Sequence, residues 1–148
     1  MQLNFPTYNF KVKKVENRNY IFDIIRKKFV VLTPEEWVRQ HLVHYFITQC
    51  QCPASLISVE KQLKVNGLNK RFDLVVYHNN GRPLLLAECK APDIMLSTET
   101  FLQAAVYNKV LGVHHMVITN GLDLSYCRYD KAFTSHHLAD DIPIYPFT

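Results

Sequence analysis

Two apolar runs at the centre of the chain, each marked by an acid, predict two β-strands joined by a turn. The first run spans residues 72–77 and contains Asp73, and the second spans residues 84–90 and ends in Glu88-Cys89-Lys90. Asn80-Gly81 lies between them and is typical of a two-residue hairpin turn, because both turn positions need positive φ. A turn at Asn80-Gly81 predicts that Asp73 lies directly opposite Glu88 on the neighbouring strand.

The hydrophobic pattern on either side of this hairpin predicts two helices and more strands. Residues 34–49 carry an apolar face at helical spacing, with Thr33 as the N-cap. A second helix is expected over residues 98–111, capped by Ser97 or Thr98 and ended by Gly112. Further strands are expected at residues 56–65, 113–119 and 122–129, with another type I′ turn at Asn120-Gly121.

The order of these elements predicts an α/β (α+β-like) fold. Strand 56–65 and the hairpin form an antiparallel meander, and the second helix is a crossover that places strand 113–119 parallel to strand 84–90. We therefore expect a mixed central sheet of four to five strands flanked by two helices. Residues 1–32 predict an additional N-terminal β-hairpin or meander, residues 33–129 the core, and residues 130–148 an extended tail, all within a single domain of residues 1–148.

The acids of the central hairpin are candidates for a metal site. Side chains alternate along a strand, so Glu88 and Lys90 share one face, and Asp73 opposite Glu88 lies on that face too. Two carboxylates at this spacing repel each other unless a cation lies between them, and oxygen ligands suit a divalent ion. Lys90 brings an ammonium group to the same place. The competing interpretation is a hairpin whose polar side chains face water.

Asp73 and the run Glu88-Cys89-Lys90 resemble the signature of the PD-(D/E)xK nuclease superfamily. The segments RFDLVVY and PLLLAECKAP are most similar to the N-terminal nuclease domain of type I restriction enzyme R subunits, in a short stand-alone form. The similarity covers residues 33–129. Phe72 precedes Asp73 where the signature has proline, a position that varies among members. The resemblance implies a restriction-endonuclease-like core.

The same resemblance suggests further site residues on the two helices. Gln103 and Tyr107 match the QxxxY motif of RecB-like members of the superfamily, in which the glutamine lies beside the metal-bound acids. Members also carry a glutamate on the first core helix that helps to hold the metal. Helical spacing places Glu35 near the apolar face and Glu36 away from it, where Glu36 completes a capping box with Thr33. Glu35 is therefore the metal-ligand candidate, and Glu36 is the alternative.

Together these residues predict a metal-dependent endonuclease that hydrolyses DNA phosphodiester bonds, in restriction and defence or in DNA repair. Asp73, Glu88 and the Cys89 carbonyl are expected to bind Mg²⁺, with Mn²⁺ as a substitute. Lys90 and Gln103 are expected to position or activate the attacking water. The alternative is a non-catalytic module that binds nucleic acid or protein on a nuclease fold. Facing carboxylates argue against it, because without metal they repel a polyanion.

Composition is consistent with this hypothesis. The chain has 148 residues, 48% of them hydrophobic, and a net charge of +4, which suits a globular protein with a DNA partner. No membrane-spanning run or signal peptide is visible, so we expect no membrane association and a cytoplasmic location. No GxxxxGK[ST] phosphate loop is present, so a restriction system would need a separate motor or methylase subunit. A chain acting alone would cut both strands as a homodimer.

Overall fold

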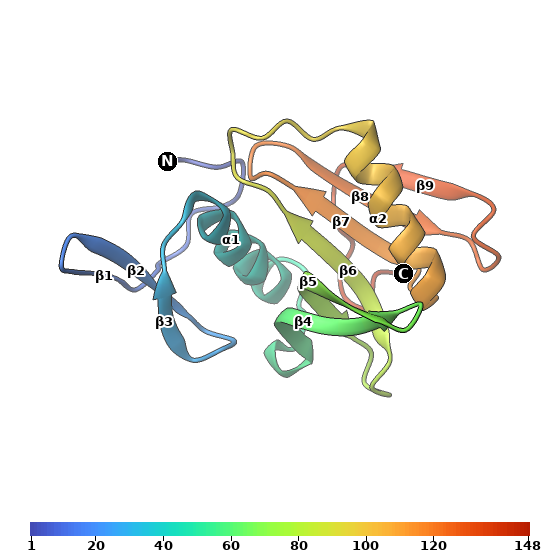
Figure 1. The fold of residues 1–148 in the computed structure, drawn as a ribbon, viewed down its shortest axis with the longest axis horizontal. Helices are drawn as coiled ribbons and strands as arrows, with labels where there is room; N and C mark the ends of the chain where they lie inside the picture. Colours follow the sequence, from blue (N-terminus) through green and yellow to red (C-terminus); the bar gives the residue numbers. More distant parts are fainter.

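The chain forms two β-sheets and two α-helices in the computed structural model, which describes residues 1–148 (Figure 1). The first sheet is a meander of β1 (Val12–Val15), β2 (Arg18–Asp23) and β3 (Lys28–Val31). The second sheet has six strands: β4 (Ile57–Val65), β5 (Leu68–Tyr77), β6 (Pro83–Cys89), β7 (His115–Thr119), β8 (Leu124–Tyr129) and β9 (His136–Ala139). The helices are α1 (Pro34–Thr48) and α2 (Thr98–Leu111), and a short 3₁₀ helix, η1, spans Ala54–Leu56.

The large sheet is mixed, as the sequence predicts. Its strands follow the order β4-β5-β6-β7-β8-β9; β6 and β7, which α2 connects, are parallel, and every other neighbouring pair is antiparallel. The N-terminal meander is also confirmed. β9 was not predicted, so the sheet has six strands instead of four to five. Its sequence, His-His-Leu-Ala, has no clear apolar alternation, and it pairs only with β8 at the sheet edge.

Both helices begin where their capping residues predict. The Thr33 hydroxyl accepts a hydrogen bond from the Glu36 backbone N–H at 3.0 Å at the start of α1. Ser97 accepts one from the Thr100 N–H at 3.1 Å at the start of α2. Gly112 ends α2 at a φ of 67°, a left-handed conformation that glycine adopts without a Cβ clash. Neither helix has the length and apolar character needed to span a membrane.

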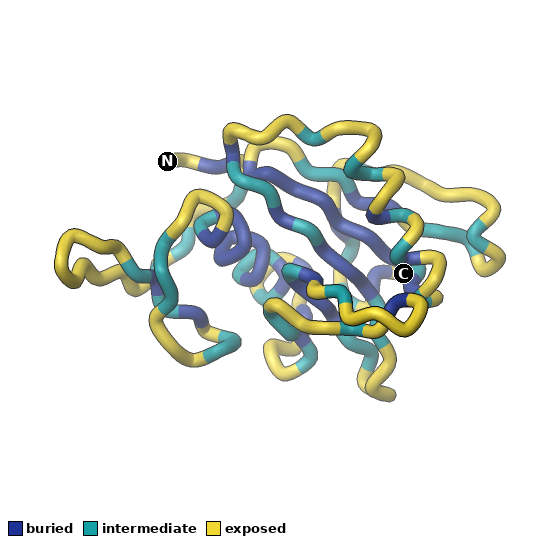
Figure 2. Tube along the Cα trace, in the orientation of Figure 1, coloured by how far each residue is buried: buried dark blue, intermediate teal, exposed yellow.

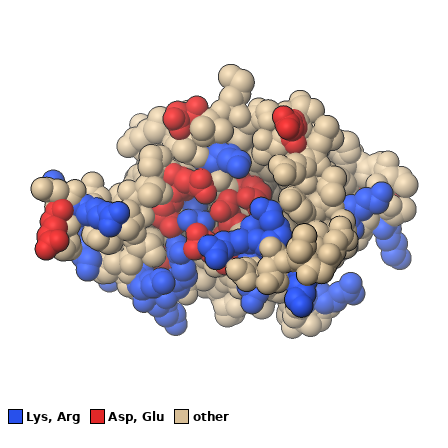
Figure 3. All heavy atoms as spheres, in the orientation of Figure 1, with Lys and Arg blue, Asp and Glu red and all other residues tan.

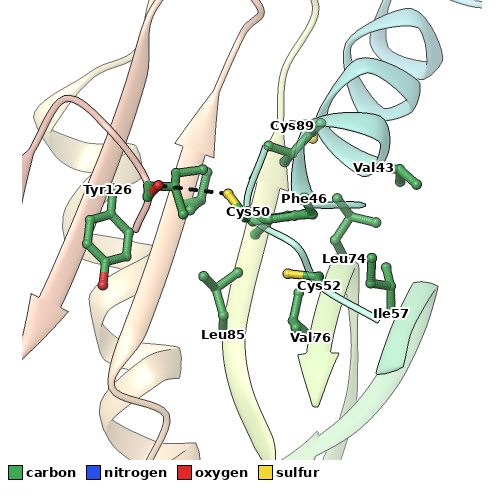
Figure 4. Packing of buried hydrophobic residues seen from close by; sticks show 14 of the residues in the cluster. Val43, Phe46, Cys50, Cys52, Ile57, Leu74, Val76, Leu85, Cys89 and Tyr126 are labelled. Atoms are coloured by element: carbon green, nitrogen blue, oxygen red, sulfur yellow. Dashed lines mark hydrogen bonds between the residues drawn. The ribbon is translucent and has the colours of Figure 1, made fainter. Parts of the chain in front are cut away.

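Alternation along β6 gives the large sheet two apolar faces. Leu85, Ala87 and Cys89 join one cluster with Phe46 of α1, and Leu86 joins another cluster that packs against α2. Figure 2 shows that the middle strands are buried along most of their length, and Figure 4 shows the α1-side cluster from close by. The helices therefore cover opposite faces of the sheet, and the Cys89 side chain lies in the core.

The loop between β5 and β6 is longer than the sequence predicts. Gly81 has a φ of 87°, but Asn80 does not adopt positive φ, so the turn is not type I′. The Gly81 N–H donates to the His78 carbonyl, and the His78 N–H donates to the Arg82 carbonyl. The ladder shifts register where Pro83 enters it. Proline causes this difference because it has no N–H to donate to a regular hairpin ladder.

The turn between β7 and β8 is not type I′ either. Only Gly121 has positive φ there, and Asn120 is buried. The Asn120 side-chain oxygen accepts hydrogen bonds from the N–H groups of Leu122 and Asp123, which is the geometry of an Asx turn. Its Nδ2 donates to the Ile94 carbonyl at 2.8 Å. The asparagine thus ties this turn to the loop before α2.

The C-terminal tail packs onto the core. Ile142 and Phe147 are buried in the α1-side cluster. The Tyr145 N–H donates to the Cys50 carbonyl at 2.7 Å, and the Cys50 thiol lies 3.8 Å from the Ile142 carbonyl, the contact dashed in Figure 4. All four cysteines are free thiols. The tail therefore contributes apolar side chains to the core in addition to strand β9.

Candidate active site

Asp73 lies where the ladder between β5 and β6 ends. Leu74 pairs with Ala87, in the register that the sequence predicts would set Asp73 against Glu88. Beyond this pair the Asp73 carboxylate replaces a backbone acceptor, and its Oδ2 accepts a hydrogen bond from the Cys89 N–H at 2.7 Å. The Asp73 side chain is therefore held between the two strands.

Glu88 lies beside Asp73 in a largely buried position. Burial, together with the charge and a hydrogen bond of Asp73, raises the pKa of Glu88 well above its ordinary value, while the charges of Lys70 and Lys90 lower it. Two carboxyl groups this close do not both ionise unless positive charge is nearby. The structure thus brings together the two acids that the sequence singled out, and the pair needs either a proton or a cation.

A cavity of about 80 Å³ opens beside Glu88, between the sheet and α2. Lys90 lines it from the sheet side, and Gln103 and Tyr107 line it from α2. Lys90 directly follows β6, and its N–H donates to the Thr119 carbonyl of β7 at 2.8 Å, which fixes the backbone at this point. Asp73 does not line this cavity. Four of the predicted residues therefore share one small space, and Asp73 approaches Glu88 from outside it.

Arg39 of α1 holds the other oxygen of Asp73. Its Nη1 lies 3.1 Å from Asp73 Oδ1, and its Nε lies 2.9 Å from Glu36 Oε2. Arg39 is only 6% exposed, so this is a buried ion pair. The sequence reasoning missed Arg39 because charged side chains on a helix are expected to face water. The available signal was its spacing, since Glu36 and Arg39 are three residues apart and share one side of α1.

Of the two glutamates at the start of α1, Glu36 lies differently from the position that the sequence predicts. Glu36 does not point away from the core and its carboxylate does not cap the helix; it is 4% exposed and bonds to Arg26, Arg39 and Gln40. The desolvation of a carboxylate is offset here by two guanidinium partners, which is why it can be buried. Glu35 is exposed, but burial of part of its carboxyl and the charge of Asp73 raise its pKa. Of the two helix acids, Glu35 is therefore the one whose carboxyl group lies close enough to Asp73 to feel its charge.

A series of ion pairs joins the site to the N-terminal sheet. Arg26, in the turn between β2 and β3, lies 2.6 Å from Asp23, 2.9 Å from Glu36 and 3.2 Å from Glu60 of β4. Glu36 also binds Arg39, which extends the series to the site. Figure 3 shows acidic and basic side chains gathered in a hollow at the centre of this face. The charged groups of the site are thus part of a larger network.

The donor atoms at the site suit a hard divalent cation. Asp73 and Glu88 offer carboxylate oxygens, and Cys89 offers a backbone carbonyl. Each Asp73 oxygen already accepts one hydrogen bond, from Arg39 or from the Cys89 N–H, and keeps a further lone pair. No group of three or more His, Cys, Asp and Glu side chains converges closely enough to hold a metal by itself. A cation here would therefore need the carbonyl and water as additional ligands.

The fold and the site together define the class of protein. A mixed sheet lies between two helices, acids on adjacent strands meet, and a lysine follows the second acid by two residues, which is the restriction-endonuclease-like arrangement that the resemblance implies. Residues 34–143 match the family described as type I restriction enzyme R protein N terminus (HSDR_N). The chain belongs to this family.

A solved structure has a similar fold. It is a candidate nuclease belonging to DUF820 from Anabaena variabilis ATCC 29413, with a TM-score of 0.51 and 12% sequence identity. The similarity covers 86% of this chain and 82% of that chain, and at this identity it concerns the fold alone. No curated protein matches the sequence at a significant level.

Proposed function

We propose that this chain is a Mg²⁺-dependent endonuclease that hydrolyses phosphodiester bonds in DNA. The observation that supports this most directly is the position of Asp73 beside Glu88 where the β5–β6 ladder ends, next to a cavity that Lys90 and Gln103 line. Two facing carboxylates repel each other and a DNA phosphate, so they weaken a simple DNA-binding surface. The same pair can bind a divalent cation, which suits a metal site. Membership of the type I restriction enzyme R N-terminal family makes DNA the expected substrate.

In this proposal Asp73, Glu88 and the Cys89 carbonyl hold Mg²⁺, with Glu35 as a further ligand through water. The bound ion supplies a Lewis acid and lowers the pKa of water. Glu88 must lose its proton before it can bind the cation. Because its pKa is raised, cation binding is expected to be accompanied by release of this proton. Mn²⁺ is expected to substitute for Mg²⁺.

The other side chains act on the phosphate and the water. In this proposal the Lys90 ammonium stabilises negative charge that develops on the phosphoryl oxygens. The Gln103 amide can donate to and accept from a water molecule in the same cavity, which orients it for attack. Arg39 is a positioning residue, because it fixes Asp73 by a bond to Oδ1 and does not line the cavity.

Partners follow from the same proposal. A type I restriction complex translocates DNA, and the chain has no phosphate-loop motif, so a separate motor or methylase subunit would supply that activity in such a complex. One such site cuts one strand, so cleavage of a duplex by the isolated chain would use two copies. A cytoplasmic location is expected for either arrangement.

The test is cleavage of supercoiled plasmid DNA with Mg²⁺, with Mn²⁺ and with chelator. The decisive variants are Asp73→Asn, which keeps an acceptor for the Cys89 N–H, and Lys90→Ala. Lys131→Ala, which removes an exposed charge at the far edge of the sheet, is the matched control. We expect metal-dependent nicking by the unchanged protein and the control, and at least about a 100-fold loss in both site variants.

Retention of full activity in Asp73→Asn and Lys90→Ala would refute the assigned roles. Calorimetric titration with Mg²⁺ distinguishes the alternative function. A protein that binds DNA but shows no affinity for Mg²⁺ or Mn²⁺ would be a non-catalytic binding module on a nuclease fold.

A further inference from the structure

A second lysine, Lys70 of β5, lines the same cavity as Lys90. It lies outside the acid–acid–lysine signature, and its backbone pairs with Leu63 of β4. The side chain is half-buried. Two cationic side chains therefore approach this small cavity, one from β5 and one from the residue that follows β6, although the signature requires only one.

Two aromatic rings hold the ammonium group of Lys70. Its Nζ lies 5.4 Å from the ring centroid of Tyr107 and 5.9 Å from that of Phe72. The two rings meet edge to face, with centroids 5.9 Å apart. Cation–π contacts act within about 6 Å, so both rings attract the ammonium group. Tyr107 of α2 thus contacts the lysine, and this contact gives a role to the second residue of the QxxxY motif.

Lys70 has no anionic partner of its own. Every ion pair of the protein within 4.0 Å involves Arg26 or Arg39, so neither Lys70 nor Lys90 is neutralised by a carboxylate at that distance. Lys70 nevertheless lies at the site, because it lines the same cavity as Glu88 and Lys90. An ammonium group held at a cavity without a counter-ion is available to an anionic ligand.

We propose that Lys70 is a second phosphate-binding residue, which contacts a phosphodiester group of the nucleic-acid strand at the site while Tyr107 and Phe72 hold its ammonium group in position. This inference rests on the proposed nuclease function, because the ligand is the backbone of the same substrate. It assigns Lys90 to the reacting phosphate and Lys70 to binding and alignment of the strand. The role of Tyr107 is then to orient Lys70 through its ring, and its hydroxyl is not required.

The test measures binding and cleavage separately. Affinity for a short labelled duplex is measured by fluorescence anisotropy over a series of salt concentrations, with Ca²⁺ in place of Mg²⁺ to limit turnover. The variants are Lys70→Met and Lys70→Gln, which remove the charge, and Lys70→Arg, which retains it. Lys131→Met is the matched control, an exposed lysine in the loop before β9. Thermal unfolding of each variant identifies any loss of folded protein.

Both neutral Lys70 variants are expected to bind about tenfold more weakly and to lower the slope of log K against log salt by about 0.9, the value for one lost phosphate contact. Lys70→Arg and Lys131→Met are expected to keep most of the affinity and the slope. Neutral Lys70 variants that match Lys131→Met in affinity and slope would overturn the inference, even if the protein cleaves DNA normally.

Tyr107 variants test the supporting ring. Tyr107→Phe keeps the ring and is expected to bind like the unchanged protein, whereas Tyr107→Leu removes it and is expected to bind several-fold more weakly. Equal binding by both variants would refute the supporting role of the ring.

The two proposals can fail separately. A protein that binds duplex DNA but does not cleave it with Mg²⁺ or Mn²⁺ contradicts the nuclease function, and the salt slope of the Lys70 variants still decides the phosphate contact. A protein that cleaves DNA with no effect of Lys70 substitution retains its nuclease function and loses the second phosphate site. Absence of any DNA binding would overturn the Lys70 assignment.

Discussion

Arg39 Nη1 lies 3.1 Å from Asp73 Oδ1, so a buried guanidinium of α1 fixes the first acid of the site. The same guanidinium binds Glu36 through Nε and Nη2. Asp73 is thereby oriented from two directions, by Arg39 on one oxygen and by the Cys89 N–H on the other. Site geometry that depends on a buried ion pair is rigid, and loss of one partner leaves an unpaired charge behind.

Replacement of Arg39 by Met is expected to destabilise the protein by about 3 kcal/mol, because it leaves Glu36 and Asp73 without their shared partner. Urea denaturation followed by circular dichroism measures this change. Arg18→Met, at an exposed arginine of β2, is the control and should change stability by less than about 0.5 kcal/mol. A loss in Arg39→Met as small as that of the control would mean that the ion pair contributes little.

Glu88→Gln is expected to stabilise the metal-free protein at neutral pH, by up to about 3 kcal/mol. Glu88 has a pKa raised by burial and by Asp73, so its ionisation opposes folding as pH rises, and glutamine removes that cost. Below the ordinary carboxyl pKa of about 4.3 the gain should vanish, because the glutamate is then protonated in both states.

The same variant should lose its response to metal. Mg²⁺ is expected to raise the melting temperature of the unchanged protein, since binding to the folded state alone stabilises it. Glu88→Gln should show no such rise. Differential scanning fluorimetry with and without Mg²⁺ measures the melting temperature of each protein. An equal rise in the two proteins would show that the ion binds elsewhere.

The buried His115 is expected to lower the free energy of unfolding at acidic pH. Burial, with smaller effects from His114 and Arg128, lowers its pKa to about 4, against about 6.5 in an unfolded chain. Between these values only the unfolded state takes up the proton, so stability falls as pH decreases from 6.5 to 4, by up to about 3 kcal/mol. Denaturation of the protein and of His115→Gln across this range should show a steeper decline with histidine, and parallel curves would contradict the assignment.

Alanine substitutions at two glycines distinguish the cost of backbone strain from the cost of a steric clash. Gly81 and Gly121 have similar φ values of 87° and 89°, but an added Cβ meets nothing within 4 Å at Gly81 and lies 2.8 Å from the Leu3 side chain at Gly121. Gly81→Ala should therefore cost about 1 kcal/mol from the left-handed conformation alone. Gly121→Ala should cost about 2 kcal/mol or more, because Leu3 or Val38 must also move. If both variants lose the same free energy of unfolding in denaturation experiments, the Leu3 side chain moves aside at little cost.

The order of the core elements and the meeting of the two acids could be predicted from sequence because both depend on local patterns. Ser97 and Gly112 define α2, and α2 makes β6 and β7 parallel. The register beside Asp73 matched even though the predicted turn was wrong. The longer loop is compensated by the register shift at Pro83, so pairing in the middle of the hairpin is the same.

Buried charge was the part that local patterns did not reveal. Helical periodicity assigned Glu36 to solvent because it ranks positions by hydrophobicity, and a carboxylate is buried only when cations from other segments meet it. Arg26 and Arg39 do so in the folded chain. Lys70 was overlooked for a similar reason, since its rings lie on β5 and α2, far apart in sequence. Such contacts depend on tertiary structure and have no periodic signal.

The Arg26 side chain touches carboxylates from three separate parts of the chain: Asp23 beside it, Glu36 on α1 and Glu60 on β4. The two sheets share no strand, and this guanidinium connects them by binding both Asp23 of β2 and Glu60 of β4. A tilt of the N-terminal meander relative to the large sheet would therefore displace Glu36, then Arg39, and so Asp73.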